Sequence, residues 1–161
     1  MQENSKYAEA FELIRSGYHD QKRDKIRMAV RKYKASIRLL PTAEGHTYLG
    51  WAYSLVGKYD RAILECYKAI DIDEDYGNSY NDLGYYLTLF KRYDEAKTWL
   101  TKAIAAPRFD ERYWAYYNLG RIHELTGNWN EALKLYYRAI EFDPKFSNGV
   151  DATLRLHGLM N

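Results

Sequence analysis

The fold is decided by a stretch that occurs three times: LGWAYSLVGKYDRAILECYKAI (residues 49–70), LGYYLTLFKRYDEAKTWLTKAI (83–104) and LGRIHELTGNWNEALKLYYRAI (119–140). Each copy begins with Leu-Gly, has an alanine twelve residues after the glycine, and has an Ala-Ile pair seven residues after that alanine. A repeat of this length is typical of helical units that bury a core only by stacking on one another. We therefore predict an all-α chain that offers the concave face of its stack for binding.

The small residues have a mechanical reason to recur at these positions. A glycine and an alanine allow two helices to cross closely, where a larger side chain would hold the backbones apart. Gly57 and Gly127 follow the first helix of their copies and favour a left-handed turn. Lys91 stands there in the middle copy, so we predict a more strained or differently shaped turn at that position.

These residues resemble the tetratricopeptide repeat (TPR) family, whose helix–turn–helix motif is about 34 residues long. With the Leu-Gly glycine in eighth place, good units span 43–76, 77–112 and 113–146, and the middle one has two extra residues around Pro107. A degenerate unit fits 10–42, and 147–161 fits a C-terminal capping helix with Ser147 as its N-cap. The resemblance implies one domain over 1–161, folded as a right-handed superhelical solenoid.

In that family, five positions of each first helix point into the concave groove. Carried over, they place the principal partner-binding residues at Tyr48, Trp51, Asn81, Asp82, Tyr85, Trp114, Tyr117, Asn118, Arg121 and Arg155. The same positions also include Phe11, Ile14, Arg15, Tyr18, Glu44, Thr47, Ser54, Asn78, Thr88, Glu124, Asn148 and Asp151.

The chemistry of the principal set favours a peptide or helix of a partner protein. Aromatic and Arg side chains dominate binding hot spots, and Asn amides can bind both backbone N–H and C=O groups. We expect the aromatic residues to bury apolar side chains, Asn81 and Asn118 to hold the backbone, and Arg121 and Arg155 to take an acidic group. The resemblance implies a scaffold or adaptor, and some chaperone-like assembly factors of bacterial secretion and pilus systems are of similar size.

One known ligand of the family is disfavoured by the sequence. Co-chaperones of this family grip the acidic C-terminal tails of heat-shock chaperones with a clamp that requires a Lys/Arg pair in the third unit. The positions that match this pair are Trp114 and Asn118. If the three units are counted from one unit earlier in the chain, the matching positions are Asn78 and Asp82. Chaperone tails are therefore not expected as partners.

No pattern in the sequence predicts catalysis or a bound cofactor. The single cysteine, Cys66, excludes an internal disulfide and is expected to be a small buried residue. The four histidines show no metal-ligand spacing, and no phosphate loop, dinucleotide fingerprint or nucleophile elbow occurs. We expect no enzyme activity, catalytic residue, metal or cofactor. The first residues lack a signal pattern, which predicts a cytoplasmic protein.

Two alternative functions remain open. Residues 1–42 have 10 Lys/Arg against 5 Asp/Glu, whereas residues 43–161 have 14 against 17. The basic N-terminal unit could bind nucleic acid or anionic lipid, although its charges are expected on the solvated convex side. Leu154, Leu156, Leu159 and Met160 of the capping segment could instead form a surface for self-association into a homo-oligomer.

Overall fold

The computed structural model describes the backbone of residues 2–160 and the side chains of residues 5–160; Met1 and Asn161, the ends of the predicted domain, lie outside. The described residues form nine α-helices, and their one β-feature is an isolated parallel bridge between Tyr76 and Arg108. The helices are α1 (Gln2–Lys22), α2 (Ile26–Leu39), α3 (Ala43–Leu55), α4 (Tyr59–Ile72), α5 (Gly77–Leu89), α6 (Tyr93–Ala105), α7 (Arg112–Leu125), α8 (Trp129–Phe142) and α9 (Ser147–Met160). None of these helices is long and apolar enough to cross a membrane.

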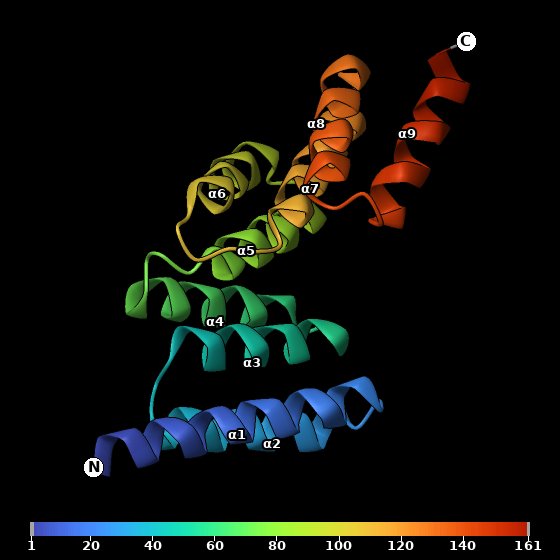
Figure 1. Ribbon diagram of the computed structural model, residues 1–161. Coiled ribbons are helices and arrows are strands. Elements are labelled where there is room, and N and C mark those ends of the chain that lie inside the picture. The colour runs from blue at the N-terminus through green and yellow to red at the C-terminus, as the bar shows by residue number, and fades with distance from the viewer. Residues whose placement is uncertain (1, 161) are drawn as a thin grey trace.

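The helices form a curved stack of hairpins (Figure 1). Each odd-numbered helix from α1 to α7 packs mainly against the helix that follows it, and α9 packs against α8 at one end. The odd-numbered helices also contact one another in turn, α1 with α3, α3 with α5 and α5 with α7. The chain is therefore an all-α solenoid in which the odd-numbered helices share one side.

The repeated glycines lie where the two helices of a hairpin cross, as the sequence predicted. A methyl group on Gly84 would lie 2.5 Å from Cγ of Leu100, and one on Gly120 would lie 2.7 Å from Cε1 of Tyr136. Both partner side chains are fully buried. The space that a methyl group would need is therefore already filled by the second helix.

Each of the four turns within the hairpins has one residue in the left-handed backbone conformation. The φ angle of this residue is +60° at Asp24, +73° at Gly57, +58° at Lys91 and +78° at Gly127. The turn at Lys91 has the same backbone shape as the turns at Gly57 and Gly127. Of the two predicted possibilities, a strained turn is therefore the one that occurs, and a differently shaped turn is wrong. The strain arises because a Cβ atom crowds the backbone in this region of φ.

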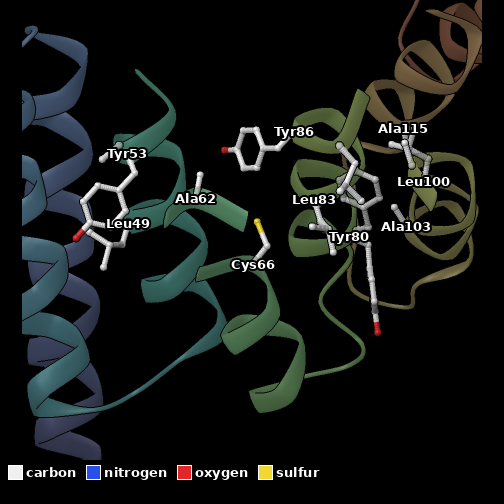
Figure 2. Close-up of a cluster of buried hydrophobic side chains, with 14 of the residues drawn as sticks. Leu49, Tyr53, Ala62, Cys66, Tyr80, Leu83, Tyr86, Leu100, Ala103 and Ala115 are labelled. Atoms are coloured by element: carbon white, nitrogen blue, oxygen red, sulfur yellow. The ribbon is translucent and has the colours of Figure 1, made fainter. Parts of the chain in front are cut away.

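The core has a main cluster of small, aliphatic and aromatic residues along the stack, from α1 to α7, and a second cluster between α8 and α9. Figure 2 shows part of the main cluster, where Leu49, Cys66 and Leu83 point into the space between adjacent hairpins. Cys66 has no exposed surface, and burial raises the pKa of its thiol well above the usual value. This agrees with the prediction that Cys66 is a buried filler.

The extra residues of the middle unit form a connection that ties this unit to the one before it. The N–H of Gly77 donates to the carbonyl of Arg108 and the N–H of Arg108 donates to the carbonyl of Asp75, both at 3.0 Å. The Arg108 guanidinium forms ion pairs with Glu44, at 2.5 Å, and with Asp73. The connection between α6 and α7 is therefore linked to α3 and to the junction between α4 and α5.

The terminal helix differs in detail from the prediction. Ser147 is the first residue of α9 and not its N-cap, because the carbonyl of Phe146 accepts the first helical bonds from Gly149 and Val150. The helix buries Gly149, Ala152, Thr153 and Leu156. Leu154, the residue in the eighth position of this last segment, is 66% exposed. At the other end, α1 already begins at Gln2, before the predicted start at residue 10.

Candidate functional site

A groove of about 740 Å³ runs along the side of the stack formed by the odd-numbered helices. Nine of the ten principal residues line it: Tyr48, Trp51, Asn81, Asp82, Tyr85, Trp114, Tyr117, Asn118 and Arg121. They are joined by Tyr18, Thr47, Ser54, Asn78 and Asn148 from the wider set of predicted positions. Helices α1, α3, α5, α7 and α9 all contribute side chains, so the groove depends on the stacking of several units.

The sequence argument missed six residues that line the groove. They are Lys22, Leu55, Tyr59, Tyr76, Tyr86 and Glu111. Tyr59 begins the second helix of a hairpin, whereas Tyr76 and Glu111 come just before α5 and α7. The carried-over positions cover only one face of each first helix, so they give no signal for residues in turns or on second helices.

Arg155 does not lie among the lining residues. Its guanidinium binds the Glu124 carboxylate with two bonds, one of them 3.0 Å between Nη2 and Oε2. This hydrogen bonding raises the pKa of Arg155 and lowers the pKa of Glu124, whose carboxylate also accepts a 2.6 Å bond from the Tyr136 hydroxyl. Both charges are therefore already neutralised within the protein.

Several other predicted positions are directed elsewhere. Ile14 is a core residue, and the Thr88 hydroxyl donates to the carbonyl of Gly84 within its own helix. Phe11 stacks on Tyr7 at 4.5 Å, away from the lining residues. Glu44 binds Arg108. A position taken from the family pattern therefore identifies a helix face but not the direction of each side chain.

Aromatic side chains form two walls of the groove. On the N-terminal side, Tyr18, Tyr48 and Trp51 lie in mutual contact, with ring centroids 6.0 to 6.2 Å apart. On the C-terminal side, the Trp114 and Tyr117 rings meet edge to face at 6.0 Å. Such packing holds the rings in place before any partner binds and reduces the entropy that binding would cost.

A chain of hydrogen bonds crosses the middle of the groove. The Asn118 amide donates to Oδ1 of Asn81 at 3.0 Å, and the Asn81 amide donates to Oδ1 of Asp82 at 3.2 Å. Each asparagine keeps further hydrogen-bonding capacity, because one amide has two donor hydrogens and an acceptor oxygen. Burial raises the pKa of Asp82 to about 7; the Asn81 bond lowers it, and the charge of Glu111 raises it further.

The charged side chains of the groove are distributed unevenly. Lys22 and Arg121 come from α1 and α7, the outermost of the four first helices of the hairpins that line the groove. Asp82 and Glu111 also line the groove. Among residues 5–160, neither Arg121 nor Asp82 forms an ion pair within 4.0 Å. Charges of both signs are therefore available to a ligand.

The chain belongs to the tetratricopeptide repeat family. Three sequence models of that family match it, over residues 43–76, 77–106 and 113–146. These ranges include all three Leu-Gly copies and the helices α3 to α8 that carry most of the groove. Proteins of this fold act as protein-interaction scaffolds, which is the broad function of the chain.

Comparison with known proteins places the fold among TPR solenoids. The chain is 29% identical over 91 residues to the mouse BBSome complex member BBS4. The aligned segment covers 56% of this chain and 17% of BBS4. It superimposes on Pseudomonas aeruginosa PilF with a TM-score of 0.87 at 20% identity, covering 94% of this chain and 69% of the other. YrrB, a TPR protein described as having an unusual peptide-binding site, gives a TM-score of 0.69 at 17% identity over 89% of this chain and 73% of that one. At these identities the likeness of the solved structures concerns the fold alone.

Proposed function

We propose that this protein is a non-catalytic adaptor whose groove holds a peptide segment, extended or helical, of a partner protein. The observation that carries the proposal is the meeting of two aromatic walls and an amide–carboxyl chain in one groove. Peptide grooves combine apolar side-chain pockets with groups that bind the backbone. The peptide-binding site named for YrrB gives a precedent for this use of the fold.

Each part of the groove has a place in this proposal. Trp51 and Trp114 would cover apolar side chains of the peptide, and Asn81 and Asn118 would bind its backbone. Arg121 has no ion pair among the described residues, so it is the group that would take an acidic side chain or a terminal carboxylate. Arg155 has no such role here, because Glu124 already occupies its guanidinium.

The test compares affinity capture from lysate of the source cells by three immobilised proteins. They are the wild type, the double variant Trp51→Ala/Arg121→Ala in the groove, and Leu64→Ala on the outward face of α4, where Leu64 is exposed. We expect a partner that wild type and Leu64→Ala retain and the double variant loses. Equal capture by all three proteins, with unchanged helicity, would rule out the groove as the binding site.

These variants are preferable to changes at Asn118 and Tyr85. Asn118 is buried and bonded to Asn81, and Tyr85 packs against the core, so their removal would also affect folding. Trp51 and Arg121 are half-buried and, unlike Tyr85, are not packed against the core, so we expect their truncation to leave the core intact. Loss of binding can therefore be separated from loss of structure.

A second candidate function is the binding of nucleic acid or anionic lipid through a row of basic residues along α2. Arg27, Arg31, Lys34 and Arg38 are all exposed, and their spacing places them on one face of the helix. Four phosphate contacts would make binding to a DNA duplex about a hundredfold weaker when salt rises from about 50 to 200 mM. Binding that does not depend on salt, or that survives Arg31→Glu/Lys34→Glu, would exclude this function.

A further inference from the structure

We propose that the middle of the groove selects a cationic side chain of the bound peptide, a Lys or an Arg, with the Asp82 carboxylate as its counter-charge. The inference rests on the proposed function, because it specifies the peptide that the groove would hold. It goes beyond that function by assigning a sign of charge and a position to the ligand.

The first argument is that Asp82 lacks a basic partner, whereas several other buried or half-buried carboxylates of this protein have one. Glu44 binds Arg108, Glu65 binds His46 and Lys68, and Glu124 binds Arg155. Asp82 has the Asn81 amide at 3.2 Å, and no ion pair within the part of the chain that the structure describes. A half-buried carboxylate without a counter-charge is costly to the folded protein, and a cation from a ligand would remove that cost.

The second argument is the position of this carboxylate. Asp82 lines the groove together with Glu111, whose charge is near enough to disfavour ionisation of Asp82. The groove lining therefore carries two carboxyl groups that are close enough to interact. Lys22 and Arg121 line it from other helices and do not form an ion pair with Asp82. An apolar or acidic ligand group at this place would leave Asp82 without a partner.

The third argument comes from the aromatic walls. Tyr48, Trp51 and Trp114 line the same groove as Asp82. The face of an aromatic ring attracts a cation, most strongly when water is excluded. The aliphatic stem of a Lys or Arg side chain would pack on these rings while its charged end reaches the carboxylate. A carboxylate in a groove lined by aromatic rings therefore suits a cationic side chain better than a neutral one.

The inference has a consequence for the dependence of binding on pH. The titratable and charged groups that face Asp82 are Tyr76, Tyr86, Tyr48, Cys66 and Glu111. Burial raises the pKa of the tyrosines and of Cys66, so these groups stay neutral between pH 6 and 8. Asp82, with a pKa of about 7, changes charge in that window. A cation binds the ionised form, so its affinity should rise by about tenfold from pH 6 to pH 8.

The test begins with a displayed library of random peptides, selected on the full chain at pH 8. Peptides that bind wild type but not Trp51→Ala/Arg121→Ala are groove ligands. We expect these to contain Lys or Arg at one fixed position, and replacement of that residue by norleucine or citrulline to weaken binding at least about tenfold. Asp82→Asn should cause a similar loss that does not add to the loss from the peptide change. Asp71→Asn removes the same charge from the exposed end of α4 and should leave binding unchanged.

The outcomes separate this inference from the proposed function. Groove ligands without a required cation, or groove ligands that bind Asp82→Asn as tightly as wild type, would overturn the cationic preference and leave the peptide groove standing. A constant affinity between pH 6 and 8 would also overturn it. A library that yields no peptide dependent on Trp51 and Arg121 would refute both.

Discussion

Adding one methyl group at Gly84 tests the close packing of the two helices in the α5–α6 hairpin. In Gly84→Ala the new Cβ would lie 2.5 Å from Cγ and 2.8 Å from Cδ2 of Leu100, and 3.2 Å from the carbonyl oxygen of Ala96. Leu100 is fully buried, so its side chain has no free space to enter. The two helices must therefore move apart, or Leu100 must leave its preferred rotamer.

The expected magnitude is the balance of two opposing effects. Overpacking of a core costs about 1–3 kcal/mol, and the short distances to Leu100 place this site at the upper end. Replacing glycine by alanine within a helix returns about 1 kcal/mol through helix propensity. Gly84→Ala should therefore lower the free energy of unfolding by about 1–2 kcal/mol.

Two matched variants make the prediction sharper. A Cβ at Gly50 would meet the carbonyl oxygen of Ala62 at 3.1 Å and Cβ of Glu65 at 3.4 Å, so a shift of a few tenths of an ångström is sufficient. Gly50→Ala should therefore stay within about 0.5 kcal/mol of wild type, because propensity offsets the crowding. Gly158 has no neighbour within 4 Å, and Gly158→Ala should stabilise the chain slightly.

The assay is urea unfolding of the four proteins, followed by circular dichroism, with the slope of each transition checked for equality. The expected order of stability is Gly158→Ala, then wild type and Gly50→Ala together, then Gly84→Ala. If Gly84→Ala were as stable as Gly50→Ala, close packing at the helix crossing would not be the reason for the repeated glycine.

Three further predictions concern the turn, the insertion and the groove. Lys91→Gly should raise the free energy of unfolding by about 0.5–1 kcal/mol in urea, because φ is +58° at this residue; a destabilised variant would contradict the strain. Arg108→Ala should lower it by about 1 kcal/mol at low salt and by less at about 1 M salt, because its exposed ion pairs with Glu44 and Asp73 are screened. Asp82→Asn should be more stabilising at pH 8 than at pH 5. Burial raises the pKa of Asp82 to about 7, so wild type loses stability as pH rises from about 4 through 7; equal effects in thermal unfolding at both pH values would refute this.

Much of the architecture follows from short-range pattern. The Leu-Gly, Ala and Ala-Ile positions predicted the helical hairpins, and the family resemblance that rests on them supplied the positions that face the groove. They could do so because helical periodicity fixes which side chains share a face, and because only small residues fit where two helices cross. Nine of the ten principal groove residues line one groove for the same reason.

The failures occur where side chains from different units meet. Arg155 was expected in the groove, but it binds Glu124, which lies 31 positions earlier in the sequence. Asn118 bonds to Asn81 across 37 positions, and Arg108 reaches Glu44 across 64. No local sequence pattern predicts these pairs of residues, because each bond depends on how one unit is rotated relative to the next and on the rotamers that the packing allows.

The sequence by itself therefore determined the kind of protein: a helical TPR solenoid with an aromatic and amide-rich inner face. Repeated spacing is sufficient for this, since units of this pattern bury their apolar faces by stacking on one another. The tertiary structure decided which charges neutralise one another and which remain open in the groove. Arg155 and Glu124 cancel, whereas Asp82 and Arg121 stay available, because only the stacking of the units sets the distances between their charged groups.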